Sequence, residues 1–66
     1  MMTTLEIYQN ALVALLMDRN VNCKLRNKGQ ELMIPDYVKK YDDAIKEIDG
    51  KIDWLKGEIT KLQEEV

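Results

Sequence analysis

The chain has 66 residues, with 10 Lys and Arg against 12 Asp and Glu, so its formal net charge is −2. This near balance gives no general attraction to nucleic acid or to anionic lipid. One cysteine excludes an intrachain disulfide, and without histidine there is no Cys/His cluster that could hold zinc. A chain this short forms a single domain, residues 1–66, with a marginal core. Association with another chain is the expected way to complete the fold.

The longest apolar run, residues 11–17, is too short to span a bilayer, which takes about 20 residues. It also differs from a signal peptide, because Glu6 stands before it and charged residues follow where small cleavage-site residues are expected. The lone thiol of Cys23 fits a reducing compartment. We therefore expect a cytoplasmic protein that does not contact a membrane.

Residues 3–18 are predicted to form the first helix. Thr3 and Glu6 match a capping box, in which each side chain satisfies a backbone donor at the helix start. A broad apolar face follows at helical spacing, and such a face is normally buried. Its members are Leu5, Tyr8, Ala11, Leu12, Leu15, Leu16 and Met17.

Residues 19–35 change character. Val21, Cys23 and Leu25 alternate with polar residues, which is the period of a half-buried strand, and a turn around Gly29 would lead into a second alternating stretch. A two-stranded hairpin is marginal unless it packs on a helix. The segment is therefore either a short β-hairpin or a loop, and the fold class is mainly α with a small α+β fold as the alternative.

Residues 36–66 are predicted to form a long C-terminal coiled-coil helix, which Pro35 opens at the first helical position. Apolar residues occupy both core positions of a seven-residue repeat, and few other positions are apolar. Such a narrow stripe is typical of a coiled coil. We call this stripe the heptad seam; it comprises Val38, Tyr41, Ile45, Ile48, Ile52, Leu55, Ile59, Leu62 and Val66.

The predicted first helix is too short to cover the heptad seam. At about 1.5 Å per residue, helix 36–66 spans about 45 Å and helix 3–18 about 24 Å. The uncovered part would leave an apolar strip in water, so we expect a helical-bundle-like homodimer. Antiparallel pairing is favoured, because it sets Asp49 near Lys56 of the other chain. The expected dimer interface comprises Tyr41, Ile45, Ile48, Ile52, Leu55, Ile59, Leu62 and Val66.

No group of residues indicates catalysis. Cys23 is the one potential nucleophile, and the sequence has no histidine to activate it, so a small buried hydrophobe is the favoured interpretation. The acidic residues of 42–49 lack the spacing of a calcium loop, and no glycine-rich phosphate loop is present. We expect neither an enzyme nor a protein that binds a cofactor or a metal.

The leading functional prediction is a protein–protein interaction module: a small regulator, inhibitor or adaptor that binds a larger protein. Small proteins of phages and mobile elements often act in this way, which is an analogy of size and class. Tyr37 and Trp54 lie off the heptad seam and are candidate contact residues, because exposed aromatic residues often anchor interfaces. Packing within the fold is the alternative for both.

Two other functions stay open. One is a dimeric nucleic-acid-binding accessory protein that uses a basic hairpin. The other is a structural oligomerisation element. The basic cluster comprises Arg19, Lys24, Arg26 and Lys28.

Overall fold

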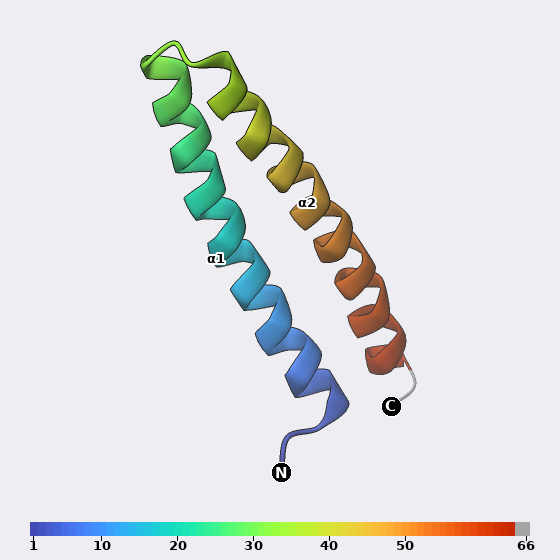
Figure 1. Cartoon of the computed structure of the whole chain (residues 1–66). Helices are drawn as coiled ribbons and strands as arrows, with labels where there is room; N and C mark the ends of the chain where they lie inside the picture. Colours follow the sequence, from blue (N-terminus) through green and yellow to red (C-terminus); the bar gives the residue numbers. More distant parts are fainter. Residues whose placement is uncertain (65–66) are drawn as a thin grey trace.

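The computed structural model describes residues 1–64 and shows two long helices that pack against each other as an antiparallel hairpin (Figure 1). Helix α1 is Thr4–Glu31, helix α2 is Pro35–Glu64, and residues 32–34 join them. The described residues contain no strand. The hairpin is elongated, with extents of 50 × 19 × 11 Å, and the start of α1 lies beside the end of α2, opposite the loop (Figure 1). The mainly α fold class is thus confirmed.

The start of α1 is capped by Thr3. Its backbone is extended, with φ −76° and ψ 163°, and its Oγ1 accepts a hydrogen bond from the backbone N–H of Glu6 at 3.1 Å. This half of the predicted capping box is confirmed. The reciprocal half differs, because the Glu6 carboxylate accepts a hydrogen bond from the Thr3 hydroxyl at 3.2 Å, rather than from the Thr3 backbone.

The predicted hairpin or loop over residues 19–35 is wrong, because α1 continues through this segment to Glu31. The alternation of apolar and polar residues there is short, and its apolar members do not share a helical face: Val21 is exposed, whereas Cys23 and Leu25 are half-buried. As a helix, the segment turns Arg19 and Arg26, seven residues apart, toward α2, where each meets a carboxylate. A two-stranded hairpin would lack a third strand, whereas the helix satisfies its own backbone and gains this contact.

The turn after α1 is a Schellman motif built around Met33 rather than glycine. The backbone N–H of Ile34 bonds to the carbonyl of Gly29 at 3.0 Å, and that of Met33 bonds to the carbonyl of Gln30 at 3.1 Å. Met33 adopts a φ of 57°, in the left-handed region that favours glycine. Pro35 then opens α2, as predicted.

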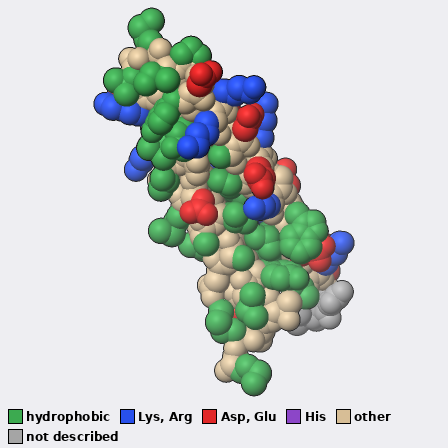
Figure 2. Space-filling view, in the orientation of Figure 1, with side chains coloured by type: hydrophobic (Ala, Val, Ile, Leu, Met, Phe, Trp, Pro, Cys, Tyr) green, Lys and Arg blue, Asp and Glu red, His purple; other side chains and the backbone are tan. Residues whose placement is uncertain are grey.

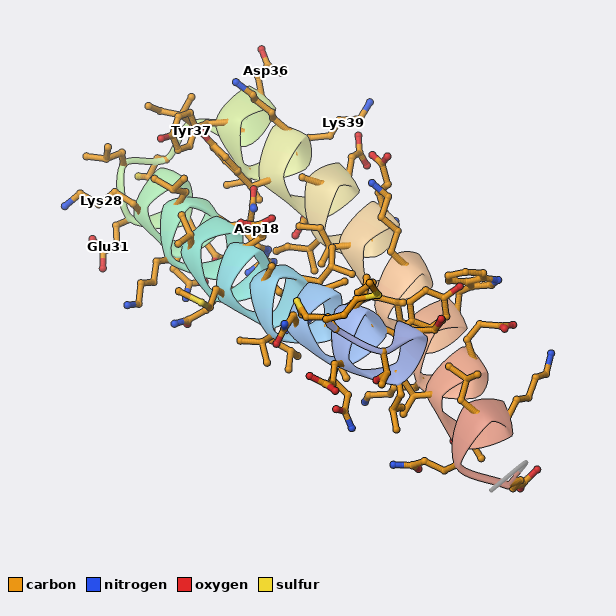
Figure 3. All side chains as sticks on the ribbon, turned by 90° about the horizontal axis from the view of Figure 1, so that it is seen from below. Asp18, Lys28, Glu31, Asp36, Tyr37 and Lys39 are labelled. Carbon is orange, nitrogen blue, oxygen red and sulfur yellow. The ribbon has the colours of Figure 1, made fainter. Side chains whose placement is uncertain are left out.

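Gly29 is the buried residue of α1 because the helices approach closely beside it. A Cβ added at Gly29 would lie 2.5 Å from Cδ1 of Tyr37 and 3.3 Å from its Cβ and Cγ. Tyr37 lies at the loop end of the hairpin (Figure 3) and packs edge-on against Tyr41, with ring centroids 4.8 Å apart. Only glycine fits at this contact without displacing the Tyr37 ring.

The core lies between the helices toward the C-terminal part of α2. Ile52, Leu55 and Ile59 are buried, with exposed fractions of 5%, 6% and 9%. The other heptad-seam residues from Val38 to Leu62 are half-buried, and Val66 lies outside the described residues.

The prediction that the first helix is too short to cover this seam is therefore wrong. With 28 residues, α1 is nearly as long as α2 with 30, and it covers the seam within one chain. The expected dimer-interface residues from Tyr41 to Leu62 face the chain's own first helix.

Candidate interaction surface

Trp54 is the most prominent exposed aromatic residue of the described chain. It lies on the flank of α2 beside α1 with 58% of its surface exposed, and the centroid of its ring lies 6.0 Å from that of the Tyr8 ring on α1. The indole therefore bridges the two helices along one edge instead of pointing freely into water. Of the two predicted contact aromatics, this one is accessible.

An open groove of about 450 Å³ lies beside the Trp54 ring. Leu15 and Leu55 contribute apolar walls from the two helices, and Gly50 leaves open space where another residue would place a side chain. Glu47 and Lys51 stand at its margin. An apolar centre with a charged margin is the usual arrangement of a protein interface.

A second apolar surface lies on the side of α1 that faces away from α2. We call it the outer stripe, and it consists of Ile7, Ala14, Met17 and Val21, all exposed. Because α-helical residues advance by 100°, these four fall within about 80° of one another around α1. Hydrophobic side chains are visible over both helices and at both ends of the molecule (Figure 2).

The loop forms a third exposed apolar region. Leu32, Met33 and Ile34 are all exposed, Met33 to 86%. Beneath them, an open hollow of about 670 Å³ extends along the start of α2 past Pro35 and Val38. Trp54 lies 19 residues along α2 from Pro35, about 28 Å at about 1.5 Å per residue, so this hollow is distant from the groove beside Trp54.

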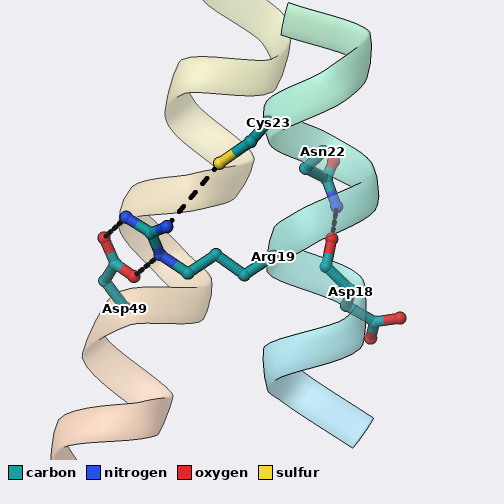
Figure 4. Close-up of polar contacts among 5 residues, drawn as sticks. All are labelled: Asp18, Arg19, Asn22, Cys23 and Asp49. Carbon is teal, nitrogen blue, oxygen red and sulfur yellow. Dashed lines mark hydrogen bonds and ion pairs between the residues drawn. The ribbon is translucent and has the colours of Figure 1, made fainter.

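The predicted basic cluster is largely engaged within the fold. Arg19 forms a two-pronged contact with Asp49: Nε is 2.6 Å from Oδ1 and Nη2 is 3.5 Å from Oδ2 (Figure 4). The hydrogen bond that Arg19 donates to Asp49 raises the pKa of Arg19 above its ordinary value, and the charge of Asp49 raises it further. Arg26 also pairs with a carboxylate across the helix contact, through a single hydrogen bond from its Nε to Oδ1 of Asp42. These two pairs fix the register of the helices.

The remaining basic residues differ from the two arginines. Lys28 lies 3.6 Å from Glu31 in a local pair on the exposed surface of α1, and Lys24 is exposed. The structure therefore does not gather the four predicted residues into one free cationic surface, since the arginines neutralise carboxylates across the helix contact.

Two further sequence candidates lie partly inside the fold. Cys23 is half-buried, and its Sγ lies 3.7 Å from Nη1 of Arg19 (Figure 4). Tyr37 is half-buried against Gly29 and Tyr41; hydrogen bonding with Tyr41 raises its pKa, and burial raises it further. Tyr37 is thus a packing residue, which was the alternative interpretation of its sequence position.

Neither the groove nor the outer stripe is predicted from the sequence. Ile7, Ala14 and Val21 stand seven residues apart, a signal that becomes visible only once α1 is known to be one helix. Within residues 1–64, no three His, Cys, Asp or Glu side chains come together as metal ligands, and neither helix is long and apolar enough to cross a membrane. The chain has no significant match among protein-family models, curated proteins or solved structures.

Proposed function

We propose that the chain is a non-catalytic protein–protein interaction module, a small regulator, inhibitor or adaptor that works as a homodimer and binds a larger protein. The observation that supports this most is the exposure of large apolar side chains on a folded hairpin. Three residues of the described chain form a buried core, whereas apolar residues remain in water on both helices and in the loop. Contiguous exposed apolar surface on a small protein indicates a binding site.

The Trp54 groove is the surface we assign to the larger protein. Tryptophan is enriched among residues that dominate binding energy, and such residues sit beside pockets that a partner fills. Here the Tyr8 ring supports one side of the indole, so less side-chain freedom is lost on binding. The open space at Gly50 lets a partner's side chain or backbone approach both helices at once.

The test is capture of a stoichiometric partner from a lysate of the native host by the immobilised chain. Trp54→Ala should weaken capture at least about tenfold, the effect of losing one dominant interface residue. Leu32→Ala is the matched control, because Leu32 is exposed to 56%, against 58% for Trp54, but lies at the loop end. Both variants must keep the helical circular dichroism of the parent. Equal capture by the parent and Trp54→Ala would refute the assignment of this groove.

The alternative of a nucleic-acid-binding protein has less support. Arg19 and Arg26 form ion pairs with Asp49 and Asp42. Lys24 and Lys28 are therefore the exposed members of the basic cluster. Salt-sensitive retention of DNA or RNA that is lost when both lysines become glutamine would favour the alternative. A solution stoichiometry above a dimer would instead favour a structural oligomerisation element.

A further inference from the structure

We propose that the outer stripe of α1 is the surface on which a second copy of the chain docks, with the two α1 helices antiparallel across a two-fold axis near Ala14. The inference rests on the proposed homodimer and names its contact surface. The heptad seam of α2 is already occupied by α1, so the dimer contact must lie elsewhere. The outer stripe is an apolar face of α1 that α2 leaves open.

The folded chain exposes more surface than a compact monomer of its mass, and the excess is close to the area that one chain buries in a dimer interface. The chain exposes 5162 Å² of solvent-accessible surface. A compact monomer with its mass of 7.7 kDa exposes about 4,300 Å². The excess of about 850 Å² is close to the roughly 800 Å² that each partner buries in a stable interface. Burial of this area against a second hairpin, in a four-helix assembly, would bring the exposed surface of each chain to the compact value.

The spacing of the outer stripe suits a symmetric partner. Ile7 and Val21 lie seven residues to either side of Ala14. An antiparallel copy related by a two-fold axis at Ala14 therefore sets Ile7 beside the partner subunit's Val21, and Val21 beside the partner subunit's Ile7. A two-fold contact uses the same surface on both chains, as this one does. The small side chain of Ala14 lets the two helix backbones approach at the axis.

Charges beside the outer stripe select the antiparallel orientation. Glu6 and Lys24 are 18 residues apart, which is five helical turns, so both stand on one flank of the stripe, and both are exposed. In the antiparallel dimer, Glu6 comes beside the partner subunit's Lys24, and this pairing occurs twice. In a parallel dimer, the flank that carries Glu6 and Lys24 would instead face the opposite flank of the partner's stripe, so this pairing would be lost. The charges on this flank therefore favour the antiparallel direction.

The first test compares Val21→Glu with Leu16→Glu by sedimentation equilibrium. Both positions lie on α1, and their exposed fractions are similar, 54% and 46%, but Leu16 lies about 140° around the helix from Val21. Glutamate at Val21 would bury a charge twice in each dimer, so we expect a dissociation constant at least about a hundredfold higher. Leu16→Glu should leave it within about twofold. Equal effects of the two variants, or a parent chain that stays monomeric, would overturn the proposal.

The second test reads the orientation. Glu6→Lys and Lys24→Glu should each weaken the dimer, and the double variant should restore it, because exchanging the charges preserves the pairing. In a Cys23→Ser background, chains carrying Ile7→Cys should form disulfides with chains carrying Val21→Cys. Efficient disulfide formation between two Ile7→Cys chains would show a parallel dimer and contradict the proposal.

These outcomes are separable from those of the proposed function. A dimer that is sensitive to Val21→Glu but captures no partner through Trp54 would retain the inference and overturn the assigned groove. A monomeric parent whose capture of a partner depends on Trp54 would overturn the inference about the outer stripe and retain the assigned groove. Dimers unaffected by Val21→Glu would place self-association on another face, which overturns the inference alone.

Discussion

Alanine substitutions at three helical glycines should have opposite effects on stability, depending on what lies beside each glycine. In a helix interior, alanine is favoured over glycine by about 0.8–1.0 kcal/mol. A Cβ at Gly50 or at Gly57 meets nothing within 4 Å, so Gly50→Ala and Gly57→Ala should each stabilise the hairpin by about that amount. These two variants are matched controls for the third glycine.

Gly29→Ala should instead destabilise the hairpin. The new Cβ would lie 2.5 Å from Cδ1 of Tyr37, and the two nearest other atoms belong to the rigid part of the same side chain. Overpacking of this kind typically costs about 1–3 kcal/mol. After subtraction of the helix-propensity gain, the expected net effect is a loss of about 1 kcal/mol, and the gap from Gly50→Ala is about 2 kcal/mol.

Urea unfolding followed by far-ultraviolet circular dichroism measures these differences, at one fixed chain concentration because the proposed self-association would contribute to stability. The same Gly29→Ala change in a Tyr37→Ala background isolates the contact, since without the ring the alanine should become stabilising. If Gly29→Ala stabilises the parent as much as Gly50→Ala does, the close approach of Tyr37 to α1 is refuted.

Two further substitutions test the turn and the core. Met33→Gly should stabilise the hairpin by about 1 kcal/mol, because a residue other than glycine in the left-handed region costs about 1–2 kcal/mol. Met33 is 86% exposed, so the substitution removes little packing. A loss of stability would show that the Met33 side chain makes a stabilising contact. Ile52→Val should cost about 1 kcal/mol because Ile52 is buried, whereas Ile45→Val, at a half-buried position, should cost less. Equal costs in thermal unfolding would contradict the placement of the core.

The second helix could be predicted from the sequence because its signals agree with one another. Pro35 marks its start, and the seven-residue apolar repeat continues without interruption to the end of the described helix. Helix start signals also located Thr3 correctly as the residue that caps α1. Local chemistry and periodicity determine these features, so no knowledge of the partner surface was needed.

The length of α1 could not be predicted in the same way. Its second half has few apolar residues facing α2, and its contacts there include the ion pairs of Arg19 and Arg26 with residues far along the chain. Such pairs become visible only when both helices are placed. Gly29 was interpreted as a turn residue, whereas the structure keeps it helical and uses its missing side chain for the approach of Tyr37.

The error in α1 carried over into the candidate site. A first helix of half the length left the heptad seam uncovered, so the seam was predicted to be the dimer interface. Once α1 extends to Glu31, the seam is covered and the unpaired apolar surface moves to the outer stripe and the Trp54 groove. A second copy of the chain and a larger protein are still proposed as partners, but their contact surfaces are now the outer stripe and the Trp54 groove.

The molar mass of the parent chain in solution, measured by light scattering after size exclusion over a concentration series, tests the central claim most directly. The chain has a mass of 7.7 kDa, so a hairpin completed by a second copy should scatter as a particle of about 15 kDa. That mass should persist over most of the series and fall toward the single-chain value only on dilution. A folded particle that keeps the single-chain mass at every concentration would contradict the claim that this hairpin is completed by a copy of itself.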